Sequence, residues 1–326
     1  MNRWIPIGLI ILLILGGTLV FMKNDQKEDL SQKVETRIVT DGNGKDLIIP
    51  SKPKRVIILS AAGTGMYLAV SEGETMVGRI ESNSFTKEES EKLVKLESVG
   101  KANGPNLEKI LALKPDLVIG VEMPFQRQLE EPLKNAGIPL WLLKSTTIEE
   151  NIKVIEIFGE LTGKSTKAKS EVEKIQQAMT DAMKRKSINN IRVLPIFGTP
   201  ESFLVALPAS LPGDILGIAG GDNIGKNLTP IQTTGATMNY VPFSLEFALQ
   251  ENPDLILFIT HGNPEAVKKS LTETLASNPA WLAIPAVREN RMEVLPFELF
   301  AINPGIRSSE AIDYLSKLLY PEGKQK

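Results

Sequence analysis

His261 is the side chain whose type and position most suggest contact with a ligand. It is the only histidine of the chain, and it directly follows an apolar run at 254–259 (DLILFI) that is typical of a buried strand. Ligands of open α/β folds bind at the carboxyl ends of strands. A lone histidine is more often structural or merely exposed, but Gly262 and Pro264 come next and would display the ring in a loop. We therefore expect His261 and Gly262 to face a ligand-binding cleft.

The sequence offers no constellation of reactive side chains. It has no cysteine, one histidine, no G-x-S-x-G nucleophile elbow and no G-x-x-x-x-G-K-[ST] phosphate loop, and its carboxylates are scattered without metal-ligand spacing. With a net charge of -2 and 23% charged residues, it also has no basic surface for nucleic acid. These features favour a protein that is not an enzyme and does not bind nucleic acid, and we expect no intrinsic cofactor.

A pseudo-repeat carries a second pair of candidate residues. Residues 106–119 (NLEKILALKPDLVI) align without gaps on residues 244–257 (SLEFALQENPDLIL), so that Glu108 matches Glu246. The matching leucines and the Pro-Asp pair serve packing and turns, since each unit is a short helix that ends before a proline and leads into a buried strand. The paired glutamates have no such packing role. A favourable interaction with the helix dipole is the alternative explanation for each.

Short apolar runs that alternate with helical periodicity must position these residues. Such runs predict buried parallel strands of an α/β fold. They occur in two blocks and therefore predict two Rossmann-like lobes, at 36–150 and 189–320, followed by a tail at 321–326. The runs are 55–60 (RVIILS), 116–121 (DLVIGV), 139–144 (PLWLLK), 192–197 (RVLPIF), 254–259 (DLILFI) and 291–296 (RMEVLP).

The two blocks are separated by a segment, 151–188, whose apolar residues fall mostly three or four apart from Ile152 to Met183. This spacing predicts one long amphipathic helix that joins the lobes. Gly159 and Gly163 weaken its first third, where a break is compatible with the sequence. A rigid helix between two lobes permits less opening than a flexible linker.

The N-terminus predicts attachment to a membrane. Residues 4–22 (WIPIGLIILLILGGTLVFM) carry no charge and, as a helix, would extend about 28 Å, enough to cross a bilayer. We therefore expect residues 1–22 to be a transmembrane anchor, with a cleaved secretory signal as the alternative, and residues 23–35 to be a polar linker. Arg3 precedes the apolar stretch, which favours a folded part outside the cytoplasm. The absence of cysteine excludes a lipid-modified cysteine as the tether.

Several motifs in this order resemble the ABC-transporter solute-binding proteins that capture siderophores, haem and cobalamin. They are KRVIILS, GPNLEKILALKPDLVIG, AGIPLWLL, IAGGDNIG, LEFALQENPDLILF and NPAWLAIPAVRENRMEVLP. The resemblance covers residues 36–319 and implies the class III periplasmic-binding-protein fold, in which a monomer holds its ligand between two lobes joined by one helix. It also implies ABC permease and ATPase subunits as partners, with Glu108 and Glu246 docking to arginine pockets of the permease.

The cargo that the resemblance implies is an iron complex. The segment FITHGNPEAVKK is similar to haem receptors of Gram-positive surface iron-uptake systems, in which the matching histidine is an axial ligand of the haem iron; here it is His261. Those receptors supply a methionine from a GQPMEPN-like loop, whereas the matching stretch GKANGPN has Asn103, and an amide is a poor iron ligand. The residues that could replace the methionine are Met66, Tyr67, Met123 and Tyr240. A five-coordinate haem, a different tetrapyrrole and an iron chelate bound without a protein ligand are the alternatives.

Other ligands and another role stay open. Siderophore receptors hold oxygen-rich chelates with arginines, for which Arg79, Arg127 and Arg307 are candidates, and cobalamin is a third cargo. We expect the loops 198–203 and 296–305, with Phe203 and Phe300, to line the cleft because both follow predicted strands. A membrane-anchored ligand sensor with the same lobes is the alternative to a transport protein.

Overall fold

The computed structural model describes residues 35–187, 190–199, 202–233, 236–260, 269, 273 and 278–321. The predicted anchor at 1–22 and nearly all of the predicted linker lie outside these residues. Within the described part, no helix combines the length and the apolar character needed to cross a membrane. The chain from Glu35 onward forms one compact unit, so the boundaries predicted between the lobes stay a prediction.

The N-terminal lobe is built on a sheet with strand order β6-β5-β4-β3-β7-β8. All neighbouring strands in it are parallel except β5 and β6. A separate antiparallel hairpin, β1 (Thr36–Thr40) and β2 (Asp46–Pro50), precedes it. The sheet strands are β3 (Val56–Ile58), β4 (Met76–Glu81), β5 (Glu97–Lys101), β6 (Gly104–Pro105), β7 (Leu117–Val121) and β8 (Leu140–Leu143). The helices are α1 (Ala61–Ser71), α2 (Lys87–Leu93), α3 (Leu107–Ala112), α4 (Pro124–Arg127) and α5 (Glu130–Asn135).

The C-terminal lobe is built on a sheet with strand order β14-β10-β9-β15-β16, in which β11 also pairs with β9. The pairs β9–β15, β15–β16 and β9–β11 are parallel. Strands β10 and β14 add an antiparallel edge, because the chain between β9 and β10 is too short for the crossover that a parallel neighbour needs. The strands are β9 (Arg192–Thr199), β10 (Ser202–Ala206), β11 (Asp222–Asn223), β14 (Tyr240–Pro242), β15 (Leu255–Thr260) and β16 (Met292–Val294), and a small hairpin comprises β12 (Ile231–Thr233) and β13 (Ala236–Met238).

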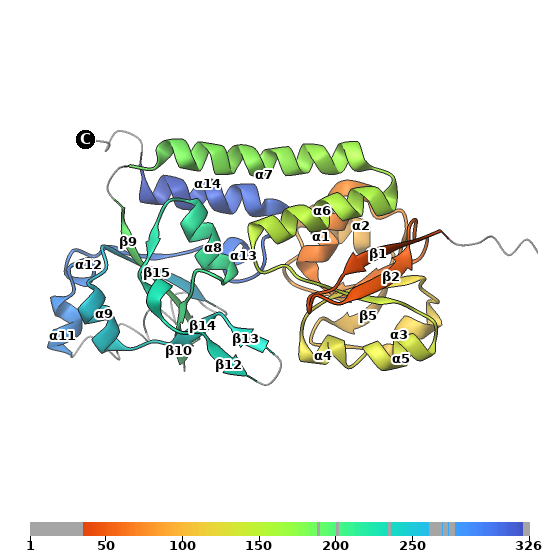
Figure 1. Cartoon of the computed structure of the whole chain (residues 1–326), viewed down its shortest axis with the longest axis horizontal. Coiled ribbons are helices and arrows are strands. Elements are labelled where there is room, and N and C mark those ends of the chain that lie inside the picture. Colours follow the sequence, from red (N-terminus) through yellow and green to blue (C-terminus); the bar gives the residue numbers. More distant parts are fainter. Residues whose placement is uncertain are drawn as a thin grey trace, which may run out of the picture. The chain divides into compact units, whose positions relative to one another are not determined.

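The helices of the C-terminal lobe include α14, which returns to the helices between the lobes. It packs against α8 and the long helix α7 (Ser165–Arg185), and Figure 1 draws it alongside α7. The short helix η2, just before α14, contacts α1 of the N-terminal lobe. The bounds are α8 (Leu211–Ile218), η1 (Ile224–Asn227), α9 (Leu245–Glu251), α11 (Pro279–Ala283), α12 (Pro285–Arg288), α13 (Phe297–Phe300), η2 (Gly305–Arg307) and α14 (Ser308–Leu319).

All six apolar runs contain a strand, and the reason is visible in the core. Successive side chains of a strand point to opposite faces of its sheet. Val56 and Ile58 of β3 lie in one buried cluster, while Ile57 lies in another. In β15, Leu257 joins the first of these clusters and the residues on either side of it join a third. Both sheets are therefore covered on both faces, and the cluster with Val56 and Leu257 is common to the two lobes.

The linking segment predicted over 151–188 is not one continuous helix. The segment forms two helices, α6 (Ile148–Thr162) and α7, and α7 is the long one with 21 residues. The chain turns at Gly163, which ends α6 with φ of 69° in the left-handed region, where glycine has no steric penalty. At Gly159 a Cβ would lie 2.5 Å from the Cβ of Ala168, so this glycine lets α6 and α7 pack closely.

Candidate functional site

A pocket lies where the two lobes meet. On the N-terminal side it is lined by the first turn of α1, which directly follows β3, and by the chain around the start of α2. On the C-terminal side it is lined by α13 and the residues that follow, directly after β16. The pocket therefore lies at the carboxyl ends of strands from both sheets, where ligands bind in this class of fold. Its residues are Ala61, Ala62, Gly65, Ser84, Thr86, Glu89, Glu298, Ile302, Asn303, Pro304, Ile306 and Arg307.

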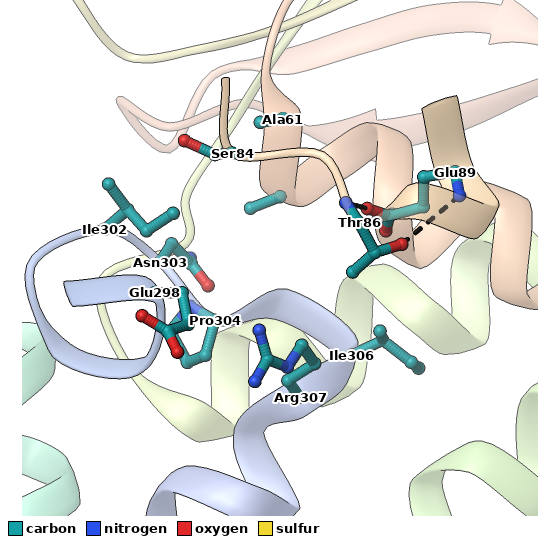
Figure 2. Close-up of a pocket in the computed structure, with 12 residues that line it drawn as sticks. Ala61, Ser84, Thr86, Glu89, Glu298, Ile302, Asn303, Pro304, Ile306 and Arg307 are labelled. Atoms are coloured by element: carbon teal, nitrogen blue, oxygen red, sulfur yellow. Dashed lines mark hydrogen bonds between the residues drawn. The ribbon is translucent and has the colours of Figure 1, made fainter. Parts of the chain in front are cut away.

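Half of the residues that line this interlobe pocket are polar. Figure 2 shows Glu298 and Arg307 on one side of the pocket and Thr86 and Glu89 on the other. Thr86 and Glu89 form a capping box at the start of α2, with hydrogen bonds of 2.7 and 3.2 Å. Arg307 donates to Glu310 at 2.9 and 3.0 Å. This hydrogen bond raises the pKa of the guanidinium, and the charges of Glu298 and Glu89 act in the same direction.

The free volume of the pocket is about 30 Å³, close to the share of one water molecule in the liquid. Pockets for drug-sized ligands or cofactors are roughly 300 to 1,000 Å³. A macrocycle would therefore need a wider opening of the same region. The pocket marks the place where the lobes meet, and it is not by itself a complete site for a large ligand.

Asn303 links a wall of the pocket to the N-terminal lobe. Its Nδ2 donates to the carbonyl oxygen of Ser145 at 2.8 Å and to the Ser145 hydroxyl at 2.6 Å, just after β8. Its Oδ1 accepts from Asn151 of α6 at 3.0 Å and from the Gly305 amide at 2.7 Å. Asn151 is fully buried and also donates to Ser308 at 3.3 Å. Because buried polar groups must be paired, this network fixes how the 303–308 segment sits against the start of α6.

Gly305 allows the backbone of the C-terminal lobe to approach α1. Its φ is 54°, and a Cβ at this position would lie 3.0 Å from the carbonyl oxygen of Ala62 and 3.4 Å from Cγ of Met66. A residue with a side chain would be strained by the backbone angle and crowded by α1. The close contact also shields Met66, which has no exposed surface.

Asp214 makes another contact between the lobes. It lies on α8, and its carboxylate accepts from the amide of Ile148, the first residue of α6, at 2.7 Å. Burial raises the pKa of Asp214, and the nearby carboxylates of Glu149 and Glu150 raise it further, while the hydrogen bond from Ile148 lowers it. The net shift is upward. The charged form of Asp214 is therefore disfavoured in the folded protein.

The ligand-binding residues predicted from the sequence fall into different environments. His261 and Gly262 lie outside the described residues; the residue before them, Thr260, is buried at the carboxyl end of β15. Met66 and Tyr67 are fully buried in the core and present no surface to a ligand. The hydroxyl of Tyr67 hydrogen-bonds to that of Thr75 at 2.5 Å, and burial raises its pKa to about 12.

Of the other residues predicted to contact a ligand, Arg307 lines the interlobe pocket, whereas Phe300, Phe203 and Asn103 do not. Phe300 is buried in α13, where its ring centroid lies 5.9 Å from that of Tyr314. Phe203 is half-buried on β10, and Asn103 is exposed in the turn between β5 and β6. Among the residues named as replacements for a methionine ligand, Met123 is 38% exposed directly after β7, next to the start of α4.

Sequence reasoning missed several pocket residues. The loop 296–305 was expected to line a cleft, and it does contribute Glu298, Ile302 and Asn303 to the pocket. The wall formed by Ser84, Thr86 and Glu89 was not anticipated. The T-x-x-E spacing of the capping box could have located the start of α2, but it gives no sign that this helix faces the other lobe.

Glu108 and Glu246 occupy equivalent places in the two lobes. Each lies in the first turn of a short helix, α3 or α9, and is exposed. An asparagine or serine side chain caps the helix in both cases. Among the described residues, neither glutamate forms an ion pair, so both carboxylates are accessible from solvent. In the part of the chain that the structure describes, no three His, Asp or Glu side chains come together as a metal site.

Comparison with known proteins gave matches over most of the chain. A family model described as "Periplasmic binding protein" matches residues 56–299, which include both sheets. The high-affinity heme uptake system protein IsdE of Staphylococcus aureus is 28% identical over 230 residues, 69% of this chain and 75% of that protein. A crystal structure of S. aureus IsdE complexed with heme has 26% identity and a TM-score of 0.65, covering 82% of this chain and 98% of that one. An ABC transporter substrate-binding protein from Listeria monocytogenes has 25% identity and a TM-score of 0.67, covering 82% and 99%.

The raised pKa of Asp214 predicts a pH dependence of stability. A carboxyl group with a higher pKa in the folded than in the unfolded protein stabilises the fold below the unfolded pKa, about 3.9. That contribution is lost as the pH rises through the folded pKa. In Asp214→Asn, the amide oxygen still accepts from Ile148 but cannot be charged. Wild type should therefore lose free energy of unfolding relative to Asp214→Asn as the pH rises from about 3.5 to 7, measured by urea denaturation.

The matched control is Asp46→Asn, which changes an exposed aspartate on β2. Its free energy of unfolding relative to wild type should vary much less over the same pH range. A difference between Asp214→Asn and wild type that stays constant with pH would show that Asp214 has an ordinary pKa.

Proposed function

Because the chain belongs to the periplasmic binding protein family, whose members are transport substrate-binding proteins and not enzymes, we propose that it captures haem for an ABC importer. Its role as the solute-binding component follows from the family. Haem as the cargo is supported by the likeness to IsdE, whose structure was determined with heme. The homologous proteins carry such iron complexes as transported ligands and have no cofactor of their own.

The observation that carries the haem proposal is the place where β15 ends. This strand lies between β9 and β16 in the C-terminal sheet, and its last residue is Thr260, so His261 is the next residue of the chain. The interlobe pocket also lies at the carboxyl ends of strands. A neutral imidazole is a common axial ligand of haem iron, and burial of the macrocycle would supply most of the remaining affinity. We assign His261 as the axial ligand, with Gly262 beside it.

Met123 is the best candidate for a second ligand on the N-terminal lobe. Asn103 replaces the methionine of the haem receptors, while Met66 and Tyr67 are buried. Tyr240 is half-buried, and burial raises its pKa, which disfavours the phenolate that would bind iron. The thioether of Met123 belongs to an exposed side chain just after β7, a neighbour of β3 in the sheet.

A siderophore is the second candidate cargo, favoured by Arg307 in the pocket lining. A guanidinium pairs well with anionic oxygens of a chelate. Against this, Arg307 already binds Glu310 and faces two more carboxylates, Glu89 and Glu298. An anionic ligand would have to compete with those groups. We therefore favour haem over a siderophore as the cargo.

We also propose that residues 1–22 tether the protein to the outer face of the cytoplasmic membrane, because residues 4–22 are uncharged and long enough to span it. The description of the matching family, "Periplasmic binding protein", supports a position outside the cytoplasm. A monomer is the state that we expect for binding one permease.

The haem proposal predicts a spectrum. On addition of haemin to the full-length protein, the absorption spectrum should develop a sharpened Soret band at stoichiometric haemin, and His261→Ala should lack it because the iron loses its imidazole. In the same titration, Met123→Ala should shift the band while haemin still binds. Met183→Ala is the control for Met123, since Met183 is a 67% exposed methionine on α7, away from the strand ends.

Two results would contradict this assignment. If wild type shows no spectral change with haemin but binds a ferric siderophore, the cargo is a siderophore. If wild type and His261→Ala give the same spectrum, haem binds without this histidine.

The docking role of the paired glutamates predicts a separation of uptake from binding. A double variant, Glu108→Lys with Glu246→Lys, should abolish haem uptake by cells that lack the native gene, because each lobe would present a cation to a cationic pocket of the permease. Its affinity for haemin should equal that of wild type. The control double variant Glu131→Lys with Glu173→Lys makes the same change in charge at exposed sites on α5 and α7. Normal uptake by the Glu108/Glu246 variant would exclude the docking role.

The tether predicts where the protein is found after cell fractionation. Full-length protein should stay with the membranes after an alkaline carbonate wash, which removes peripheral proteins but leaves spanning helices in place. A variant in which a signal peptide with a known cleavage site replaces residues 1–22 should be released in soluble form. Recovery of the full-length protein in the soluble fraction, shortened at its N-terminus, would show that the segment is a cleaved signal.

A further inference from the structure

Gln126 joins three strand ends of the N-terminal lobe. It lies in α4 and has no exposed surface. Its Nε2 donates to the carbonyl oxygen of Leu59, just after β3, at 2.8 Å and to that of Ala102, in the turn between β5 and β6, at 3.0 Å. Its Oε1 accepts from the amide of Val121, the last residue of β7, at 2.8 Å. One buried side chain thus holds three backbone segments that are distant in sequence.

The chemistry of the site calls for a primary amide. A carboxamide has two N–H donors and a carbonyl acceptor on one planar group, and Gln126 uses both kinds in this position. A glutamate would lack the donors, and an apolar side chain of the same length would lack all three bonds. Each backbone partner would then be left without a buried hydrogen bond, which is costly for the fold.

The packing around the carboxamide leaves it little freedom. A Cβ at Gly120 would lie 2.4 Å from Oε1 of Gln126 and 3.0 Å from Cδ2 of Leu142. Glycine at 120 therefore makes room for the carboxamide beside β7. The amide of Gln126 also donates to the carbonyl oxygen of Met123 at 3.0 Å, so that the chain between β7 and α4 is held by both the side chain and the backbone of the same residue.

The three segments held by Gln126 all lie at the carboxyl ends of strands, and this end of the sheet faces the proposed ligand. Leu59 leads into the first turn of α1, where Ala61 lines the interlobe pocket. Ala102 adjoins the exposed Asn103. Val121 leads to Met123 and to Phe125, an aromatic side chain that is 51% exposed. The distances between these exposed groups therefore depend on one buried amide.

We propose that Gln126 is a positioning residue for the N-terminal wall of the ligand site. It touches no ligand and acts by fixing the ends of β3, β5 and β7 relative to one another, so that the groups displayed there meet a rigid ligand together. The proposal rests on the proposed function in one point: it assumes that the ends of β3, β5 and β7 face the ligand. A purely structural role would lower stability without a selective effect on these strand ends.

The test compares Gln126→Met with Ser71→Ala in the full-length protein. Methionine has a similar length but cannot form the three hydrogen bonds. Ser71 is also buried in this lobe, but it lies at the other end of the sheet, away from the carboxyl ends of the strands. Its hydroxyl donates to the carbonyl oxygen of Tyr67 and accepts from the amide of Gly73. Two quantities are measured: the affinity for haemin by absorption titration, and backbone hydrogen exchange by mass spectrometry.

Gln126→Met should weaken haemin binding at least tenfold and speed hydrogen exchange in residues 59–62, 100–106 and 121–125, at the ends of β3, β5 and β7. Ser71→Ala should change neither the affinity nor the exchange at these strand ends. Gly120→Ala leaves Gln126 in the chain but forces its carboxamide to move, so it should give the same pattern as Gln126→Met and replaces it if that variant does not fold.

An unchanged affinity for haemin in the variant that folds would overturn the proposal, and so would an equal loss in Ser71→Ala. If wild type itself fails to bind haemin, the proposed cargo is wrong, while hydrogen exchange still decides the role of Gln126. Faster exchange confined to the three strand ends supports it, and exchange that is unchanged or raised throughout the lobe excludes it.

Discussion

Phe158 of α6 lies fully buried against Tyr67 of α1 and Trp141 of β8, with its ring edge-on to both at centroid distances of 5.1 and 6.1 Å. The apolar core around it continues through Ile175 of α7 to Ile312 of α14 and contains side chains from both sheets. Full burial of one such side chain stabilises a protein by about 1.5 to 3 kcal/mol. Separation of the lobes along this core would expose many of them at once, so the rest of the architecture is built around it.

This shared core leaves the carboxyl ends of the strands as the place where a ligand can enter. The chain passes from the N-terminal to the C-terminal lobe through α6 and α7, and it returns through η2 and α14 to contact α1 and α7. Polar contacts between the lobes occur at Asn303, Asn151 and Asp214. Such buried polar contacts add less to stability than apolar packing does, but they define one geometry because each must be paired. Any change in lobe separation has to pass through these contacts.

A binding site of this kind works through displacement of water and placement of a few polar groups. In the N-terminal lobe, Gln126 holds the ends of β3, β5 and β7 together, and the chain after β3 forms the first turn of α1 that lines the pocket. The C-terminal wall includes Asn303, which belongs to the network around α6. Gln126 supports the strand ends from within the lobe without lining the pocket, whereas Asn303 is itself part of the pocket wall.

From the sequence, six strands of the two sheets and their division into two blocks could be predicted. The six apolar runs became strands because each is long enough to cross a sheet covered on both faces, and the pseudo-repeat placed Glu108 and Glu246 in equivalent first turns. These features depend on residues close together in the chain. The break at Gly163 was compatible with the sequence, but helical periodicity alone does not show whether a glycine ends a helix or lies within it.

The tertiary structure was needed to show which of the candidate side chains are buried and which residues line the pocket. Met66, Tyr67 and Phe300 are apolar or aromatic and follow strands, as ligand-binding residues often do, yet all three are buried by helices from distant parts of the chain. Glu89 and Glu298 are surface-like residues in sequence, and the packing of two lobes brings them to one pocket. Whether a residue is exposed depends on which residues pack against it. The shared core determines those neighbours, so a local sequence pattern does not reveal exposure.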